Sequence, residues 1–289
     1  MNDKLDSVEL VTRPGNSTQF YLFNLFADYV VPGGGCIWTT DLLYLLDLLG
    51  VGERAARATL ARMKHRGWFH TYRQGRQSQY VISDEGRALL EEGDRRIFEE
   101  PLIDWDGKWR LVVYSLPETL RSERNELRTK LIWLGFGHLA PGTWISPHDR
   151  RSEIEALAHS LAIRDCVTLF NGRVAQPDEE IVRRCWDVPA LAEEYAAFLK
   201  RYQAQYEALQ ASIGQGGRET SQHEELFRRR FWLTFDFQSF PRKDPNLPQC
   251  LLPPGWVGYR ARDMFHDYRA LLSTAMGNFL DKHIGPCIQ

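Results

Sequence analysis

The side chains best suited to chemistry lie in a short alanine-rich stretch, VGERAARATLARMKHRGW, from Val51 to Trp68. On a helix with about 100° per residue, one side of this stretch consists of Ala56, Thr59, Leu60 and Met63. The opposite side consists of Arg54, Arg57, Ala58, Ala61 and His65. Arginines near the start of a helix can bond to base edges, most often guanine, and small alanines allow the close approach this needs. The pattern therefore predicts a helix that enters the major groove of DNA, with Arg54 and Arg57 contacting bases and Ala58 or Ala61 a thymine methyl group.

The charge around this stretch points the same way. Seven basic residues lie between Gly52 and Tyr80 against Glu53 alone, a local charge of +6 in a chain of formal net charge -2. A basic patch on an otherwise balanced protein is typical of nucleic-acid contact. The alternative is that these side chains are only the solvated face of a helix. Arg62 lies toward the flank of the helix, so we expect it to contact phosphate or solvent, and Lys64 contacts phosphates or complements the helix dipole.

The flanking elements favour the DNA interpretation. Helices are expected over residues 17–30 and 39–49, with Thr39 or Thr40 capping the second and Gly50 ending it. Two β-prone runs then flank a turn at Gln74–Gly75 and predict a hairpin over residues 68–82. A further helix follows, with Ser83 or Asp84 as its cap. This order of elements is that of a winged helix-turn-helix.

The hairpin of such a domain lies on the phosphate backbone or in the minor groove, where positive charge supplies affinity. Its tip is expected to carry Arg73, Arg76, Gln77 and Gln79. The predicted DNA-binding residues are Thr40, Arg54, Arg57, Ala58, Arg62, Lys64, His65, Arg73, Arg76 and Gln77.

The middle of the chain changes character after Asp104. A strand-like run, KWRLVVYSLP, precedes a helix with one stripe of Leu120, Leu127, Leu131 and Leu134. Two short strands surround the turn at Pro141–Gly142, and a helix with a capping box of Ser152 and Glu155 leads into the strand CVTLFNGRV. The order β-α-β-β-α-β is that of a ferredoxin-like domain.

Helices are expected to dominate from Pro177 onward, over residues 178–186, 189–213, 219–240 and 261–280, with a turn at Gly214–Gly217. The sequence thus predicts an α+β protein with three parts. These are an N-terminal winged helix-turn-helix over residues 1–98, a ferredoxin-like domain over 104–176 and a mainly helical C-terminal domain over 177–289.

Several classes of protein are disfavoured. The five scattered cysteines form no C-x-x-C pair and the eight histidines show no metal-ligand spacing, so we expect a reduced cytoplasmic chain without zinc. No signal peptide and no apolar run of membrane-spanning length is visible. Walker A, G-x-S-x-G and H-E-x-x-H motifs are missing, so we expect neither an enzyme nor a cofactor.

Two separated motifs carry a family resemblance. WDGKWRLVVYSLPETLRSERNELRTKLIWLGFGHLAPGTWISP, Trp105 to Pro147, and DPNLPQCLLPPGW, Asp244 to Trp256, closely resemble the PaaX family of bacterial transcriptional repressors. The resemblance covers nearly the whole chain. It implies a homodimer that binds double-stranded operator DNA, represses an operon for phenylacetate-type catabolism, and is released by an aryl-CoA effector such as phenylacetyl-CoA. Relatives answer to other aromatic or acyl-CoA ligands, so that alternative stays open.

The middle region also resembles the small ferredoxin-like nucleases of CRISPR systems. Those enzymes carry an acidic residue at the end of the first strand, where it holds a metal ion. Here that place is taken by Ser115, and Asp104 and Asp106 precede the strand at its other end. Because the carboxylate that Mg²⁺ needs is missing, a metal-dependent nuclease is the weaker alternative.

A coenzyme A thioester requires cations for its phosphates and an apolar slot for its acyl group. The candidate residues for that effector are Arg110, Trp144, Arg183, Trp186, Arg229 and Trp232. The alternative is that these tryptophans are core residues and that the run Arg228–Arg230 is a solvated face.

Overall fold

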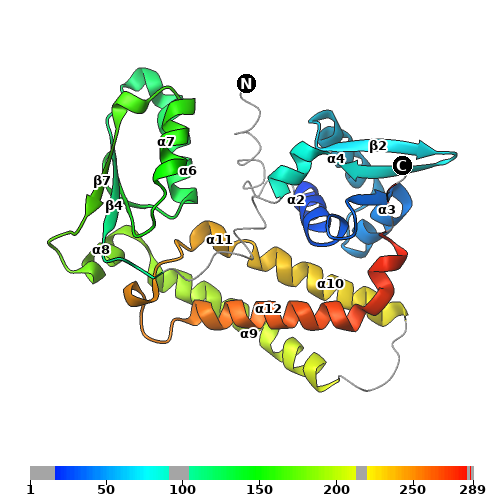
Figure 1. The fold of residues 1–289 in the computed structure, drawn as a ribbon. Helices are drawn as coiled ribbons and strands as arrows, with labels where there is room; N and C mark the ends of the chain where they lie inside the picture. Colours follow the sequence, from blue (N-terminus) through cyan, green and yellow to red (C-terminus); the bar gives the residue numbers. More distant parts are fainter. Residues whose placement is uncertain (1–16, 91–103, 213–219, 285–286, 288–289) are drawn as a thin grey trace. The chain divides into compact units, whose positions relative to one another are not determined.

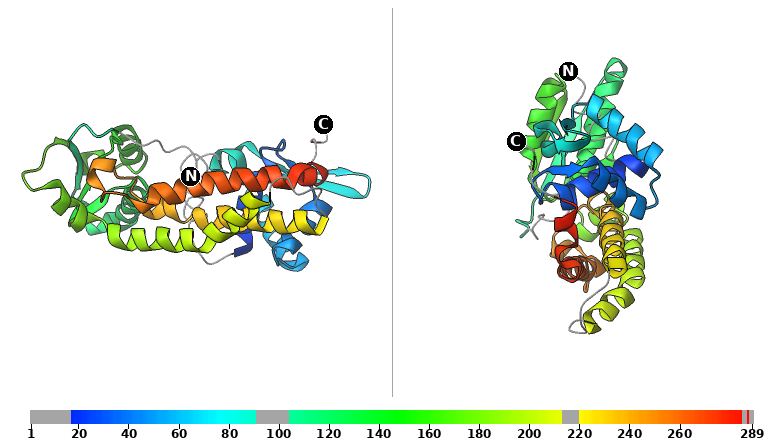
Figure 2. Two further views of the ribbon diagram at one scale, coloured as in Figure 1. Left: turned by 90° about the horizontal axis from the view of Figure 1, so that it is seen from below. Right: turned by 90° about the vertical axis from the view of Figure 1, so that its right-hand side faces the viewer.

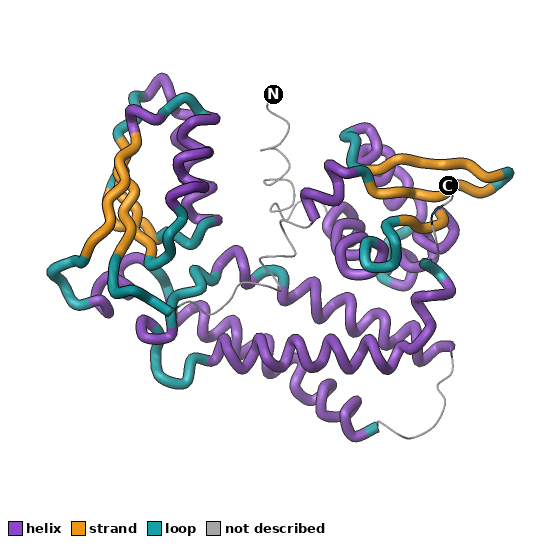
Figure 3. The backbone as a smooth tube through the Cα atoms, viewed as in Figure 1, coloured by secondary structure: helices purple, strands orange, loops and turns teal. Residues whose placement is uncertain are grey.

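The structure, a computed structural model, describes residues 17–90, 104–212, 220–284 and 287. The described chain consists of helices and two antiparallel sheets, so the expected α+β class is confirmed (Figure 1 and Figure 3). It divides into two compact units. Unit 1 combines residues 1–99, 201–237 and 263–289, and unit 2 combines residues 100–200 and 238–262. No helix of the described residues is long and apolar enough to cross a membrane.

Unit 1 begins with helices around a small sheet. Its elements are α2 (Ser17–Leu25), the π-helix η1 (Phe26–Val30), β1 (Cys36–Trp38), α3 (Thr39–Leu48), α4 (Glu53–His65), β2 (Phe69–Gln74) and β3 (Gln77–Ile82). The three strands pair in the antiparallel order β1-β3-β2, and Figure 1 shows β2 and β3 projecting beyond the helices. A helix over residues 84–90 follows. Ser83 caps it, as expected, by accepting the Gly86 N–H through Oγ at 3.0 Å.

Local details of unit 1 correct the sequence expectations. Gln74 pairs with Gln77, so the hairpin turn consists of Gly75 and Arg76 rather than Gln74–Gly75. Neither threonine caps α3, because Thr39 is already helical and the residue before it is Trp38. Thr39 instead donates from Oγ1 to the Ser78 carbonyl at 2.9 Å, which fastens the start of α3 to β3.

The remaining helices of unit 1 come from the second half of the chain. They are α10 (Thr220–Phe237), the end of α9 (Val188–Ala211), most of α12 (Val257–Met276) and the 3-10 helix η5 (Gly277–Lys282). Helices α10 and α12 lie side by side (Figure 2), and Phe237 stacks on Phe265 with ring centroids 3.9 Å apart. The expected turn at Gly214–Gly217 lies outside the described residues.

Unit 2 contains the second sheet. Its elements are β4 (Trp109–Tyr114), α6 (Arg121–Trp133), β5 (Gly137–Ala140), β6 (Thr143–Ser146), α7 (Arg151–Ser160), β7 (Val167–Gly172), α8 (Asp178–Cys185) and α11 (Phe240–Lys243). The strands pair in the order β5-β6-β4-β7. Helices α6 and α7 cover one face, where Leu127, Leu131 and Ile154 pack with Val112 and Trp144 of the sheet. The expected β-α-β-β-α-β order is therefore the order observed.

The capping box expected at α7 is wrong. The helix starts at Arg151, one residue before Ser152, and Arg150 in the N-cap position makes no side-chain cap bond. Ser152 donates to the Glu153 carboxylate rather than accepting a backbone N–H. Asp149 accepts the Arg151 N–H at 3.2 Å instead, so an aspartate two residues upstream supplies the acceptor.

Two of the cysteines that were expected to be reduced lie side by side. Cys36 of β1 and Cys287 have Cα atoms 5.4 Å apart, a separation that a disulfide can span. The two residues are 251 positions apart in the sequence, so no local spacing could indicate the pair. Cys166, Cys185 and Cys250 are free.

Candidate nucleic-acid interface

Helix α4 separates its residues as the sequence predicts. Ala56, Leu60 and Met63 are fully buried and Thr59 is 2% exposed. The residues of the other side, Arg54, Arg57, Ala58, Ala61 and His65, are all exposed. The helix begins directly after Gly52, and Gly50 takes a left-handed conformation with φ of +78°. That conformation favours glycine, and it allows α3 and α4 to be joined by a turn of four residues.

The basic side chains of α4 have few strong partners. Arg57 donates from Nε to Glu53 at 2.7 Å, and both side chains are more than half exposed. Arg62 donates to the Thr59 hydroxyl at 2.9 Å, which keeps it along the flank of the helix. Lys64 donates to the Thr71 hydroxyl of β2, and the Arg66 guanidinium lies 5.2 Å from the Trp68 ring centroid. Arg54 and Arg57 therefore remain available to an anionic partner, because an exposed ion pair is weak.

The hairpin extends this basic surface. Arg73, Arg76 and Gln77 are exposed around the turn, and Thr40 is exposed in the first turn of α3. All ten predicted DNA-binding residues are therefore accessible to solvent. Gln79 is the exception among the residues expected at the tip, because it is fully buried between β1 and β2.

The six effector candidates divide between the two units. Arg110, Trp144, Arg183 and Trp186 belong to unit 2, and Arg229 and Trp232 belong to unit 1. Trp144 is 3% exposed and belongs to the core, and the exposed His138 ring lies 5.2 Å from it between centroids. Trp186 stacks on buried Trp109 at 6.1 Å between centroids, whereas Arg183 is exposed in α8. Trp232 packs edge-on against Tyr21 and Phe235.

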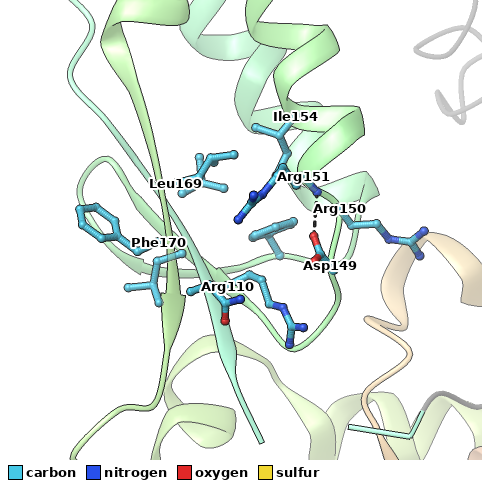
Figure 4. Close-up of a pocket in the computed structure, with 11 residues that line it drawn as sticks. Arg110, Asp149, Arg150, Arg151, Ile154, Leu169 and Phe170 are labelled. Carbon is cyan, nitrogen blue, oxygen red and sulfur yellow. Dashed lines mark hydrogen bonds between the residues drawn. The ribbon is translucent and has the colours of Figure 1, made fainter. Parts of the chain in front are cut away.

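Arg110 lines a small hollow, partly open to solvent, between the sheet and the start of α7. Figure 4 shows Arg150, Arg151 and Asp149 around it, with Ile154 and Leu169 as its apolar wall. Its charges are largely matched within the protein. Asp106 binds Arg110 through both oxygens at 2.7 and 2.9 Å, and Glu153 pairs with Arg150 at 3.5 Å. The hollow therefore offers no strong net charge to an anion.

The arginine run of α10 is not a solvated face. Arg230 is buried and donates to Asp28 of η1 at 2.9 Å, and its guanidinium lies 4.3 Å from the Tyr29 ring centroid. Arg269 of α12 also pairs with Asp28, and Thr234 donates to it at 3.1 Å. We call Asp28, Arg230 and Arg269 the buried triad.

Sequence reasoning missed the buried triad, although a signal existed. Asp28 is the one charged residue in a mostly apolar run, YLFNLFADYVV. A lone acid in such a run requires a buried cation, because an unpaired buried charge is very costly. The π-helical turn at Asp28 is of the kind that often marks a functional position.

The middle region shows no constellation for metal chemistry. Ser115 directly follows β4, at the strand end where the nuclease hypothesis requires a carboxylate. Within the ranges that the structure describes, no group of three or more His, Cys, Asp or Glu residues could hold a metal ion.

Comparisons with known proteins agree along the chain. Three family models match, described as PaaX-like protein over residues 17–86, PaaX protein central Cas2-like domain over 103–182, and PaaX-like protein C-terminal domain over 186–282. The transcriptional repressor PaaX of Escherichia coli K12 is 31% identical over 247 residues, which cover 83% of this chain and 76% of that protein. An uncharacterized protein of Mycobacterium tuberculosis has a similar fold, with a TM-score of 0.56 and 21% identity over 84% of this chain and 91% of its own.

Proposed function

The chain belongs to the PaaX family of transcriptional repressors, and from that premise we propose that it binds double-stranded operator DNA through α4 and the β2–β3 hairpin. One observation carries this proposal. The polar side of α4 is exposed and combines arginines with alanines, whereas its other side is buried. A helix of this shape fits the major groove while the adjacent hairpin contacts the backbone.

We assign the roles by position on this surface. Arg54 and Arg57 contact base edges, and Ala58 contacts a thymine methyl group. Arg62, Lys64 and His65 lie along the flank and C-terminal end of α4, where phosphates border the groove. Thr40 and the hairpin residues Arg73, Arg76 and Gln77 complete the backbone contacts, which position the protein without selecting sequence.

The layout we propose follows from the element orders. Residues 1–98 form a winged helix-turn-helix, residues 104–176 a ferredoxin-like domain, and residues 177–289 a mainly helical C-terminal domain. The protein acts in the cytoplasm. It is a homodimer there, because two recognition helices can match two half-sites one or two helical turns apart.

We further propose that an aryl-CoA such as phenylacetyl-CoA releases the protein from the operator of a phenylacetate-type catabolic operon. A different aromatic or acyl-CoA effector is the alternative. Among the candidate contacts, Arg110, Arg183, Trp186, Arg229 and Trp232 are at least partly exposed, whereas Trp144 is buried. The effector acts only through a difference in affinity between the free and the DNA-bound geometry.

Binding to the intergenic DNA beside the gene, measured by fluorescence anisotropy at fixed salt, tests both the proposed operator binding and the proposed release by the effector. We expect sequence-specific binding that phenylacetyl-CoA abolishes and free phenylacetate does not. Release by another thioester alone would retain the repressor and reject phenylacetyl-CoA as its effector. Equal affinity for the intergenic DNA and a scrambled duplex would contradict operator recognition.

A further inference from the structure

One face of α3 is held by residues from the distant C-terminal half of the chain. Asp41, Tyr44 and Leu48 follow one another at three- and four-residue spacing, so they lie along one side of the helix. Facing them are Glu224 and Arg228 of α10 and His283, which follows η5. We call Glu224, Arg228 and His283 the α3 clamp.

The contacts of the α3 clamp cover the length of α3. His283 bonds through Nδ1 to the Asp41 carboxylate at 2.8 Å, and its ring lies 4.9 Å from that of Tyr44. Tyr44 donates its hydroxyl to Glu224 at 2.7 Å. Burial, together with this bond to the Glu224 carboxylate, raises the pKa of Tyr44 to about 12. A tyrosine hydroxyl is protonated at neutral pH even at its ordinary pKa of about 10, so Tyr44 is a proton donor there.

Arg228 makes the contact nearest to the DNA-binding surface. It donates from Nε to the Leu48 carbonyl at 3.0 Å and pairs with Glu224 at 3.7 Å. Leu48 is the last residue of α3, where carbonyl groups lack partners inside the helix. A cation at this end also complements the helix dipole. Arg228 therefore fixes the end of α3 directly before the four-residue turn that leads into α4.

We propose that Glu224, Arg228 and His283 are positioning residues that set the orientation of α3, and through the turn that of α4, for sequence-specific DNA binding. The inference rests on the proposed function for its DNA readout. The α3 clamp is polar and only partly buried, with the Arg228 side chain 36% exposed. Such contacts add little to overall stability, but they fix a geometry on which contact with base edges depends.

An arginine outside every proposed site provides the control. Arg201 of α9 lies in the same unit, and its exposed side chain pairs with Asp236 at 3.0 Å. Replacing Arg201 removes the same charge from unit 1, and its pair with Asp236 does not involve α3. A difference between Arg228→Ala and Arg201→Ala therefore reports the contacts of Arg228 with Leu48 and Glu224, not the loss of charge.

The first test compares both variants on the intergenic DNA and on a scrambled duplex of equal length. We expect Arg228→Ala to weaken specific binding about tenfold, which is 1.4 kcal/mol, with unchanged binding to the scrambled duplex and an unchanged melting temperature. Arg201→Ala should match the wild type, and Arg228→Lys should recover part of the loss because a lysine still donates to a carbonyl. Equal specific binding by the Arg228→Ala and Arg201→Ala variants would overturn the proposal.

A second readout requires no DNA. The amide groups of Gly50 and Val51 bond to the carbonyls of Asp47 and Leu46 at the end of α3. We expect their hydrogen exchange to become roughly tenfold faster in Arg228→Ala and to stay unchanged in Arg201→Ala. Identical exchange in the two variants would reject the positioning role even if operator binding is seen. Failure of the wild type to bind DNA, with this difference in exchange present, would reject the proposed function alone.

Discussion

Two arginine-rich stretches of the chain have opposite surroundings. In α4, Arg54 and Arg57 are exposed, and the ion pair between Arg57 and Glu53 is exposed to solvent. In α10, Arg228 and Arg230 reach across to residues near the N-terminus, at Leu48 and Asp28. The first stretch is open to a partner outside the chain, whereas the second already has its partners inside it.

The difference shows that a run of positive charge is interpreted by what surrounds it. Alanines lie between the arginines of α4, so the exposed side of this helix has small side chains that let another molecule approach closely. The arginines of α10 are followed by Phe231 and Trp232, which are typical of a helix that packs inside a protein. The same residue type is therefore exposed in one helix, as the proposed recognition of DNA requires, and assembles unit 1 in the other.

The largest effect is expected from a substitution that removes the buried arginine of α10. Arg230→Met should lower the free energy of unfolding by about 3 kcal/mol, the lower end of the range for breaking a buried ion pair, because Arg269 still pairs with Asp28. Urea unfolding of the full chain, followed by circular dichroism, measures this loss. Arg229→Met is the control and should stay within about 0.5 kcal/mol of the wild type. Equal unfolding midpoints for both variants would show that Arg230 is not structural.

The next effect tests the external role of α4. Arg57→Ala should weaken operator binding by about 1–3 kcal/mol, with the loss concentrated at one base pair. The stability of the variant should change little, since the pair of Arg57 with Glu53 is exposed. Binding to a set of single-base operator variants measures the base dependence. A loss spread evenly over all sequences would make Arg57 a phosphate contact instead.

A smaller effect is expected in the hairpin. Arg76→Ala removes an exposed cation at the turn between β2 and β3. We expect a uniform loss of DNA affinity, and the slope of log affinity against log salt should fall by about 1, as for one lost phosphate contact. DNA titrations at several salt concentrations measure this slope. Gln77→Ala is the uncharged control, because Gln77 is exposed on the same hairpin, whereas Gln79 is buried and therefore unsuitable. An unchanged slope would place the hairpin away from the DNA.

Much of the local fold could be predicted from the sequence. The apolar periodicity of α4 and the leucine stripe of α6 are local patterns, and Leu127 and Leu131 are indeed fully buried. Helix caps were predicted less well, because a Ser, Thr or Asp in the right place has several possible partners. Thr39 bonds to β3 and Ser152 to Glu153, whereas Ser83 does cap its helix.

The internal contacts of α10 could not be predicted from the sequence. Arg230 and Asp28 are 202 positions apart, and Arg228 and Leu48 are 180 apart. Local spacing carries no information on such pairs, and the same holds for Cys36 and Cys287. Exposure of a predicted contact residue is easier to predict than its partner, because burial follows helix periodicity whereas pairing follows the path of the whole chain.

The smallest effect is expected at Glu53, the exposed partner of Arg57 in α4. Glu53 is the only acidic residue between Gly52 and Tyr80, and it holds Arg57 by an exposed pair of the i,i+4 kind. Glu53→Gln should cost at most about 0.5 kcal/mol of stability, but it removes a negative charge that repels phosphates. We therefore expect tighter binding to scrambled DNA and a lower ratio of operator to scrambled affinity, since Arg57 loses the partner that orients it. Arg54, which needs no help from Glu53, should keep its base preference, and an unchanged affinity ratio would show that Glu53 does not restrain Arg57 on DNA.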